Sequence, residues 1–438
     1  MVQIPYRCME AAAAKPQDRR ARGQLPPGYS AVMAWSRREL LRLGASSLAL
    51  AATRCTRRPP AAATAPPRYV VIVYLDGGID PVLTLDPKRP AEVAAEVDVP
   101  YAAEDIAVTG PVKLGPHFAP LAPWASRMAI VKGVALDTAN HNTGWGQVTR
   151  LRTRAAPAMP GILDIIGRHG DGQPLPALSF GDLAPDQYTP DHADGQLVFA
   201  IHELGRERLE ALGRSLHAEA RELARRGADP RVARTTDNYR RVGQLAERLQ
   251  DVPPFVPRTW GGAASERTGR DLQRALWAFE HDLARCAFVK VRPYAGWDSH
   301  NHNELRQRNC SRAFTDVFVP FLGELATRRN RHGTLAETTL ILAGSEIGRF
   351  PRLNGNAGKD HFPQTAFLLL GAGVQPGVFG ATDERMCARP LDPASGHPVT
   401  RGGHGLVLDD LGATLLAIAG IAPEPHGYTG RVLRWLIA

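Results

Sequence analysis

Six consecutive residues, 297–302, bring one carboxylate and two imidazoles together in a single short stretch. They read Trp297-Asp298-Ser299-His300-Asn301-His302. Asp and His supply the oxygen and nitrogen ligands that bind divalent metals in proteins. The stretch follows the apolar run 286–291, which predicts a β-strand, and open α/β sheets bind ligands beyond the carboxyl ends of their strands. We therefore predict that Asp298 binds a metal together with His300, His302 or both.

Other carboxylates and one imidazole follow further predicted strands or loops. Because the loops at the carboxyl edge of a parallel sheet converge, these side chains are expected to meet the first stretch. A helix cap or a turn explains an early Asp equally well, and turn chemistry explains a glycine-rich loop. The predicted ligands are Asp76 after the run 69–75, Glu346 after 338–343, and Asp360 with His361 after the glycine-rich segment 354–358; Asp80 and His404 are further candidates.

The segment 140–147 follows a second predicted strand, 128–134, and opens a predicted helix. A hydroxyl at a helix start lies among free N–H groups that favour an anion, so Thr143 is a candidate nucleophile and His141 a candidate ligand or oxyanion donor. A helix cap formed by Thr143 or Asn142, and a structural role for His141, are the alternatives. Three polar side chains are expected to contact an anionic substrate: Asn142, Arg349 and Lys359.

The elements that must position these residues alternate between strands and helices. That order predicts an α/β three-layer sandwich with a mainly parallel sheet over residues 69–438. Residues 203–287 carry helical apolar spacing, with a break near 227–230, and are expected to form a helical insertion. Further helices are predicted over about 311–329 and 408–419, and a further strand over 366–370.

The charge of the chain is concentrated at its N-terminus. Of a net charge of +9 over 438 residues, residues 1–58 carry +8, from eleven Lys and Arg against three acids, and the rest carries +1. The nearly neutral remainder argues against a nucleic-acid-binding protein. Residues 36–42, Ser-Arg-Arg-Glu-Leu-Leu-Arg, precede a short apolar run and indicate a twin-arginine export signal within a leader, 1–58, followed by a linker, 59–68. Met33 offers an alternative start, which would place residues 1–32 outside the protein.

Taken together, these motifs resemble the bacterial family of domain of unknown function 1501, which is grouped with the alkaline-phosphatase and sulfatase superfamily. The resemblance extends from about Tyr69 to the C-terminus, and twin-arginine leaders are common in the family. It implies an alkaline-phosphatase-like fold. The matching segments are 75–80 (Leu-Asp-Gly-Gly-Ile-Asp), 296–300 (Gly-Trp-Asp-Ser-His), 344–349 (Gly-Ser-Glu-Ile-Gly-Arg), 358–361 (Gly-Lys-Asp-His) and 377–383 (Gly-Val-Phe-Gly-Ala-Thr-Asp).

The superfamily pattern orders an early Asp, a Ser or Thr nucleophile, Asp-x-x-x-His, an Asp-His pair and a late His. By that resemblance Asp298 is followed by His302, whereas the family's own Trp-Asp-Ser-His signature favours His300. The last ligands fit in two registers. In the first register, Glu346 takes the place of the Asp in the pair, Ile347 replaces the His of the pair, and His361 is the late histidine. In the second register, Asp360 and His361 form the pair, and His404 is the late histidine.

The resulting hypothesis is an exported hydrolase-like protein that uses a divalent metal (Zn, Mn, Mg or Ca) on a phosphate or sulfate ester. The alternative is a non-catalytic exported binding or assembly protein that retains the fold. Both versions imply the twin-arginine export machinery as a partner and a periplasmic or secreted location. No transmembrane span is expected in the mature chain.

Overall fold

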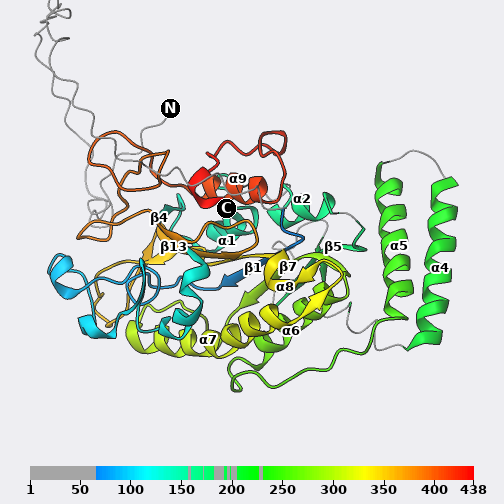
Figure 1. The fold of residues 1–438 in the computed structure, drawn as a ribbon, viewed down its shortest axis with the longest axis horizontal. Coiled ribbons are helices and arrows are strands. Elements are labelled where there is room, and N and C mark those ends of the chain that lie inside the picture. The colour runs from blue at the N-terminus through cyan, green and yellow to red at the C-terminus, as the bar shows by residue number, and fades with distance from the viewer. Residues whose placement is uncertain are drawn as a thin grey trace, which may run out of the picture. The chain divides into compact units, whose positions relative to one another are not determined.

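The computed structural model describes residues 66–155, 159–170, 172–181, 192–194, 198, 205–225 and 230–438, so the predicted leader and its signal lie outside the described residues. Within these ranges, eight strands form one sheet in the order β14-β4-β13-β10-β1-β7-β5-β6 (Figure 1). Their bounds are β1 (Tyr69–Leu75), β4 (Met128–Ala135), β5 (Leu175–Phe180), β6 (His192–Asp194), β7 (Ala284–Val291), β10 (Thr339–Gly344), β13 (Gln364–Gly371) and β14 (Gly377–Phe379).

Every neighbouring pair in this sheet is parallel except those made by β13, which runs antiparallel to both β10 and β4. The sheet is therefore mainly parallel, and the carboxyl ends of β1, β4, β7 and β10 lie at one edge. Reversal of β13 brings its amino end to that same edge. A residue that precedes β13 thus meets residues that follow the other strands.

Helices cover both faces of the sheet, as Figure 1 shows. Because strand side chains alternate between faces, Val71 and Val73 of β1 join the core under α6 and α7, whereas Val70 and Ile72 join the core under α1, α2 and α9. This arrangement confirms the predicted three-layer α/β class. The covering helices are α1 (His141–Arg150), α2 (Ile162–Arg168), α6 (Glu266–Glu280), α7 (Asn303–Thr327), α8 (Leu335–Thr338) and α9 (Leu408–Ile418).

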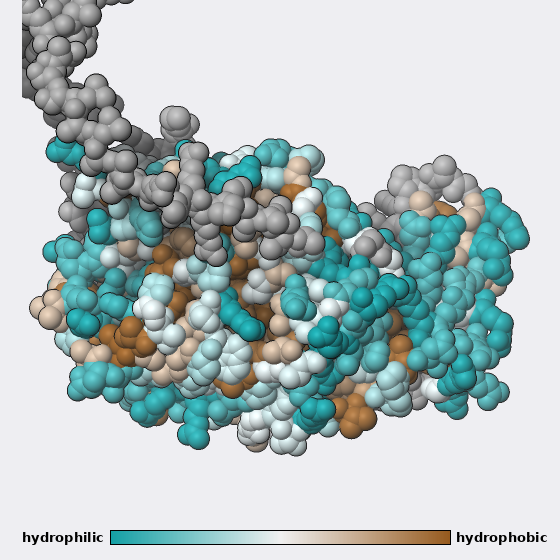
Figure 2. All heavy atoms as spheres, viewed as in Figure 1, coloured by the Kyte–Doolittle hydropathy of each residue, from teal (hydrophilic) through white to brown (hydrophobic). Residues whose placement is uncertain are grey.

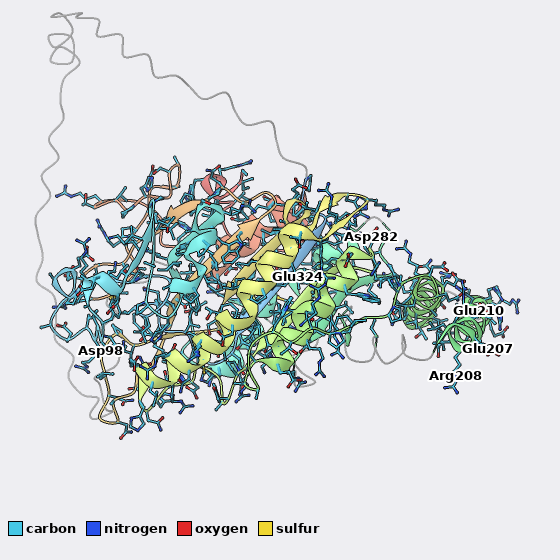
Figure 3. The ribbon with its side chains drawn as sticks, turned by 60° about the horizontal axis from the view of Figure 1, so that its bottom comes forward. Asp98, Glu207, Arg208, Glu210, Asp282 and Glu324 are labelled. Carbon is cyan, nitrogen blue, oxygen red and sulfur yellow. The ribbon has the colours of Figure 1, made fainter. Side chains whose placement is uncertain are left out.

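Two 20-residue helices, α4 (Arg206–Arg225) and α5 (Pro230–Leu249), pack on each other beside the sandwich (Figure 1). They and α6 lie in the range predicted to be a helical insertion. Their outer faces are charged: Figure 3 labels Glu207, Arg208 and Glu210 on α4, and Figure 2 shows this part of the surface as hydrophilic. None of the helices in the described ranges is long and apolar enough to cross a membrane.

The smaller elements lie in the connections. Two-stranded sheets pair β2 (Ala107–Thr109) with β3 (Val112–Leu114), β8 (Arg329–Asn330) with β9 (Gly333–Thr334), and β11 (Gly348–Arg349) with β12 (His361–Phe362). The last of these pairs joins the segments that carry two predicted site residues. Short 3-10 helices span Pro90–Glu92, Ala103–Asp105, Ala119–Arg127, Glu424–His426 and Arg434–Leu436.

Most of the predicted elements are present, and α7 differs most. It begins at Asn303, about two turns earlier than predicted, and His302 precedes it with a left-handed φ of 46°. The predicted strand over 366–370 is present as β13, but its antiparallel direction was not predicted. Strands β5 and β6 and helix α2 were not predicted at all.

At the amino edge of the sheet, opposite the site, Asp282 collects several hydrogen bonds. Its carboxylate accepts from Arg68 Nη2 at 2.9 Å, the Tyr69 hydroxyl at 2.8 Å, Gln173 Nε2 at 2.8 Å and Arg331 Nη2 at 2.7 Å. Arg248, in the last turn of α5, donates to the backbone carbonyl oxygen of Asp282 at 2.9 Å, so this residue, which Figure 3 labels, lies close to the end of α5. Burial raises the pKa of Asp282, but the hydrogen bonds from Arg68, Gln173 and Tyr69 outweigh it and hold the pKa well below its usual range.

Asp282→Asn is expected to lower the free energy of unfolding at pH 7 by about 3 kcal/mol, because it leaves buried donors and cations without their carboxylate. Asn tolerates the left-handed φ of 54° at this position, so backbone strain does not contribute. A lowered folded-state pKa means that the stabilisation is present above the unfolded pKa of about 4 and is lost as pH falls below it. Denaturant unfolding of both proteins at pH 7 and pH 3 measures this. The difference in free energy of unfolding between the parent chain and Asp282→Asn should be smaller at pH 3 than at pH 7. Asp251→Asn, at an exposed surface pair, is the control, and an equal loss of stability in that variant would contradict the role of Asp282.

Candidate metal centre

Loops from four strands and the segment before β13 meet at the carboxyl edge of the sheet. Helix α1 begins at His141 after β4, the stretch 297–302 follows β7, and Glu346 follows β10. His361 precedes β13 and reaches the same edge because that strand is reversed. Backbone hydrogen bonds join the loops: Trp297 N–H donates to Asp76 O at 2.9 Å, and Lys359 N–H donates to Ser299 O at 3.0 Å. The convergence predicted from the strand order is therefore present.

One carboxylate oxygen, Oδ1 of Asp298, is the centre of this arrangement. The Nε2 atoms of His141, His300 and His361 each lie 3.3 Å from it. The Nε2 atoms of His300 and His361 lie 2.9 Å from each other. These four side chains form the histidine–Asp298 cluster. Each is partly exposed, from 21% for His361 to 46% for His300, so the cluster is open to solvent.

The other ring nitrogen of each histidine faces a hydrogen-bond acceptor. His141 Nδ1 lies 2.6 Å from Glu346 Oε1, and His300 Nδ1 lies 3.1 Å from Asp360 Oδ1. His361 Nδ1 lies 2.7 Å from the carbonyl oxygen of Ala139. An acceptor at Nδ1 places the proton there and leaves the Nε2 lone pair pointing to the centre. Metal-binding histidines are oriented by the same kind of partner.

The donor set fits a divalent cation. In neutral rings the Nε2 lone pairs of His300 and His361 would face each other at 2.9 Å, and a shared cation removes that repulsion. His141 Nε2 is buried, and the acceptor that it faces is Asp298 Oδ1 at 3.3 Å. The Nε2 atoms of His141 and His361 and a carboxylate oxygen of Asp298 also lie within 4.8 Å of one another. Three imidazoles and one carboxylate are a ligand set that zinc accepts in four-coordinate sites.

Two carboxylates, the buried Glu346 and the partly exposed Asp298, set the electrostatics of the cluster. Burial lowers the pKa of His141, but hydrogen bonds and charge from Asp298 and Glu346 outweigh it and raise the pKa to about 9. Burial raises the pKa of Asp298, but hydrogen bonds from His141, His361 and Arg349 hold it well below its usual range. Asp298 is thus ionised at neutral pH, and a cation that binds His141 must displace the proton that the raised pKa keeps on this ring.

Arg349 and Lys359 were predicted to contact a substrate, but both side chains are fully buried. Arg349 Nη2 donates to Asp298 Oδ1 at 2.8 Å and to the carbonyl oxygen of Gly77. Lys359 Nζ lies 2.8 Å from Asp80 Oδ2 and 3.4 Å from Asp98 Oδ2. This corrects the prediction: the two cations hold the loops of the site together, and neither has exposed surface with which to meet a substrate.

His302, predicted alongside His300, lies outside the cluster. Its backbone turns left-handed before α7, and its N–H donates to Asn356 O at 3.2 Å. The exposed imidazole makes no hydrogen bond or ion pair with any described residue of the cluster. The family-specific spacing, rather than the superfamily spacing, therefore describes this chain. His404 is also elsewhere, because its Nε2 lies 2.6 Å from Asp410 at the start of α9.

Four of the remaining candidates lie next to the cluster without contacting its centre. Glu346 and Asp360 touch the histidines at Nδ1, which places them as orienting groups. Thr143 and Asn142 are exposed on the first turn of α1, and Thr143 N–H donates to Asn140 Oδ1 at 3.1 Å. Asn140 is thus the residue that caps α1, a position given to Thr143 or Asn142 in the alternative prediction.

Two further candidates, Asp76 and Asp80, have other partners. Asp76 accepts from the Tyr74 hydroxyl at 3.0 Å and pairs with cations of β7 and the loop after it. Asp80 is fully buried, pairs with Lys359 and accepts from Asn303 Nδ2 at 2.8 Å. Sequence reasoning missed Ala139, whose backbone carbonyl orients His361. A backbone acceptor leaves no trace in residue type.

Gly358→Ala is expected to weaken metal binding by about tenfold or more, the effect seen when groups around metal ligands are lost. A β-carbon at Gly358 would overlap the backbone carbonyl of His300, so the loops that carry His300 and His361 would have to separate. Gly355→Ala in the same loop is the matched control, because a β-carbon there meets nothing within 4 Å. Zinc titration of both variants measures the effect. Equal affinities would contradict the close packing of the two loops.

Fold and site together define an α/β protein whose sheet edge carries a cluster of histidines and carboxylates. The chain belongs to the family described as protein of unknown function (DUF1501), whose model matches residues 203–429, just over half of the chain. No curated protein sequence matches it.

Several solved structures are similar to this chain at low sequence identity. The lipoteichoic acid synthase of Listeria monocytogenes is 8% identical with a TM-score of 0.40, over 84% of this chain and 75% of that one. A protein in the alkaline phosphatase superfamily from Vibrio parahaemolyticus is 11% identical with a TM-score of 0.42, over 86% and 71%. A putative sulfatase of Bacteroides thetaiotaomicron is 11% identical with a TM-score of 0.32, over 85% and 75%.

Proposed function

We propose that this protein is an exported, metal-dependent hydrolase-like protein that acts on a phosphate or sulfate ester. One observation carries the proposal: three histidine Nε2 atoms lie at the same 3.3 Å from Asp298 Oδ1, and each ring is oriented by an acceptor at Nδ1. Such an arrangement serves metal binding better than it serves stability, since it places partly buried lone pairs together.

The proposed ligands of the metal are His141, His300, His361 and Asp298. Among the metals considered, three nitrogen donors favour Zn over Mn, Mg and Ca, which prefer oxygen ligands. When bound, the metal would supply Lewis-acid polarisation of an ester oxygen. Glu346 and Asp360 are proposed to fix the tautomers of His141 and His300, which keeps the rings from rotating during turnover.

Thr143 is proposed as the nucleophile. Its hydroxyl is exposed two residues beyond His141, on the first turn of α1. The positive end of the helix dipole lies at this turn and favours an anionic ester. Asn142 is exposed beside it and is proposed to donate hydrogen bonds to the substrate. Attack by the Thr143 oxygen on phosphorus or sulfur would release the alcohol and leave the acid group on the threonine until water removes it.

Export is proposed from the sequence alone. The twin-arginine segment 36–42 and the apolar run after it support recognition by the twin-arginine machinery and a periplasmic or secreted location. The nearly neutral charge of residues 59–438 supports a small anionic ester as the substrate rather than a nucleic acid.

A non-catalytic binding or assembly protein is the second candidate, and two observations favour it. The Thr143 hydroxyl makes no hydrogen bond to a general base among the described residues. Ile347, fully buried, occupies the position at which the superfamily pattern has a second histidine. Fold and ligands would then be retained without turnover.

Hydrolysis of 4-nitrophenyl phosphate and 4-nitrophenyl sulfate by the full chain, before and after chelation, tests the proposal. We expect activity on at least one ester, lost on chelation and restored by Zn. Thr143→Ala should reduce kcat by about a thousandfold. Thr327→Ala, at an exposed position near the end of α7, is the control. A metal-loaded protein without turnover on either ester would favour the non-catalytic candidate.

A further inference from the structure

The Asp76 carboxylate has a different environment from that of Asp298. Lys290 Nζ lies 3.6 Å from Asp76 Oδ2, and Arg292 Nε lies 3.3 Å from the same oxygen. The Tyr74 hydroxyl donates to Oδ1 at 3.0 Å. Among the described residues no imidazole contacts Asp76. The carboxylate that the superfamily pattern assigns to a metal therefore has two cations and a phenol in direct contact, while burial and the charge of the nearby Glu346 carboxylate raise the pKa of Asp76.

Strand pairing fixes this arrangement. Strands β1 and β7 are parallel neighbours, with Tyr74 opposite Lys290 and Leu75 opposite Val291. Asp76 and Arg292 are the next residue on each strand path, so the two side chains meet where both strands end. The ion pairs therefore follow from the register of the sheet and do not depend on a flexible loop.

The Lys290 side chain is held in a fixed position at this edge of the sheet. Its side chain is 7% exposed, and its ammonium lies 4.9 Å from the ring centre of Trp145. Trp145 lies one turn into α1, the helix that begins with His141. A buried ammonium held over an indole and beside one carboxylate is a fixed positive charge. Arg292, by contrast, is 57% exposed and can move to meet a ligand.

The Asp76 group adjoins the histidine–Asp298 cluster through the backbone. Gly77 N–H donates to Glu346 Oε1 at 3.0 Å, and the same oxygen contacts His141. A β-carbon on Gly77 would lie 2.6 Å from the backbone nitrogen of Asp298. Glycine at this position lets the two groups approach, so a ligand bound to one lies close to the other.

We propose that Asp76 binds no metal and instead anchors Lys290 and Arg292, which form an oxyanion-binding pair beside a single metal. A second divalent cation at Asp76 would face two positive charges at short range, which disfavours it. Lys290 and Arg292 would contribute to anion binding in different ways. Lys290 supplies a point charge, and Arg292 supplies a planar fork that can bind two oxygens of a tetrahedral anion.

This inference rests on the proposed function. It specifies that the site binds one metal ion and that Lys290 and Arg292 bind the anion. The ligand class is a tetrahedral oxyanion, phosphate or sulfate, either free or as the acid group of an ester. Asp76 orients the pair in the absence of ligand, in the way that a carboxylate orients a metal-binding histidine.

Metal content measured by elemental analysis tests the role of Asp76. The full chain and its Asp76→Asn variant, both purified after zinc loading, should each hold one equivalent of zinc. Loss of zinc in Asp76→Asn, or two equivalents in the parent chain, would overturn the inference. Absence of zinc from the parent chain would overturn the proposed function itself, so the two failures are distinguishable.

Calorimetric titration with inorganic phosphate, and separately with sulfate, tests Lys290 and Arg292. In the zinc-loaded chain, Lys290→Met and Arg292→Met should each weaken binding of the preferred anion by about tenfold or more while zinc content stays at one. Arg270→Met is the matched control, because this arginine is exposed on α6 and pairs with Glu266 at 2.8 Å. Thermal unfolding checks that Lys290→Met folds. If Lys290→Met does not fold, Arg292→Met, at an exposed position, tests the proposal on its own. Unchanged affinity for both anions in Arg292→Met would overturn the proposal.

Discussion

Asp298→Asn is expected to abolish tight metal binding by the histidine–Asp298 cluster, and with it any metal-dependent hydrolysis. Asp298 Oδ1 is the one atom that His141, His300 and His361 all approach at 3.3 Å. An amide of the same shape removes the negative charge that offsets the cation. Loss of a directly binding group should exceed the 10- to 100-fold loss typical of groups that only orient ligands, so we expect zinc affinity to fall by roughly a thousandfold.

The substitution also affects the buried Arg349, which donates to the same carboxylate. Its other contacts, to the backbone carbonyls of Gly77, Gly78 and Lys359, remain in the variant. Folding is therefore expected to survive with a lower melting temperature, which thermal unfolding checks before zinc is titrated. His302→Asn is the control, since this exposed histidine lies outside the cluster and Asn tolerates its left-handed φ. Equal zinc affinity in Asp298→Asn and the parent chain would contradict the assigned ligands.

Lys359→Met is expected to cost about 3–5 kcal/mol of unfolding free energy, the usual effect of removing one partner from a buried ion pair. Both Lys359 and Asp80 are fully buried, and their charged atoms lie 2.8 Å apart. Without the ammonium, Asp80 keeps a hydrogen bond from Asn303 but loses its compensating cation. The change also releases the segment that carries Asp360 and His361, so metal binding should weaken in parallel.

A double variant separates charge from packing. Lys359→Met combined with Asp80→Asn removes both charges, so it should be more stable than Lys359→Met alone, because no uncompensated carboxylate remains. Denaturant unfolding of the parent chain, both single variants and the double variant gives the coupling energy. Additive losses would contradict the ion pair as the origin of the effect.

The alternation of apolar runs and helical segments along the sequence allowed most of the sheet, and the edge that carries the candidate site, to be predicted. Runs such as 69–75 and 338–343 are apolar throughout, as buried parallel strands are, and polar residues follow them at once. Strand β6 was not predicted because three residues are too few for a pattern. The direction of β13 was not predicted because strand direction depends on pairing, which a run of apolar residues does not specify.

Most residues of the candidate site were predicted from the sequence, but the role of each residue was not. Residue type and spacing pointed to Asp298, His300, His361 and Glu346, all of which meet. They did not distinguish a group that faces the centre from one that holds a ring nitrogen, as Glu346 does for His141. That distinction depends on side-chain direction. Similarly, the choice between His300 and His302 depended on where α7 begins and on one left-handed residue before it.

Burial explains the wrong prediction for the two cations. Arg349 and Lys359 lie near the site in sequence, and cations near such sites commonly bind anionic substrates. Carboxylates from distant loops, Asp298 and Asp80, already pair with them. Arg292, just after β7, is 57% exposed and is therefore better placed to meet an anion, with the 7% exposed Lys290 on β7 beside it. A run predicted to be a buried strand gave no reason to assign a role to either cation.

Anomalous diffraction from crystals of the zinc-loaded chain, collected at the zinc edge, tests the central claim most directly. The account predicts one anomalous peak per chain, within coordination distance of the Nε2 atoms of His141, His300 and His361 and a carboxylate oxygen of Asp298. A peak between Asp76 and Glu346, or no peak at the histidines of a chain shown by elemental analysis to contain zinc, would contradict it.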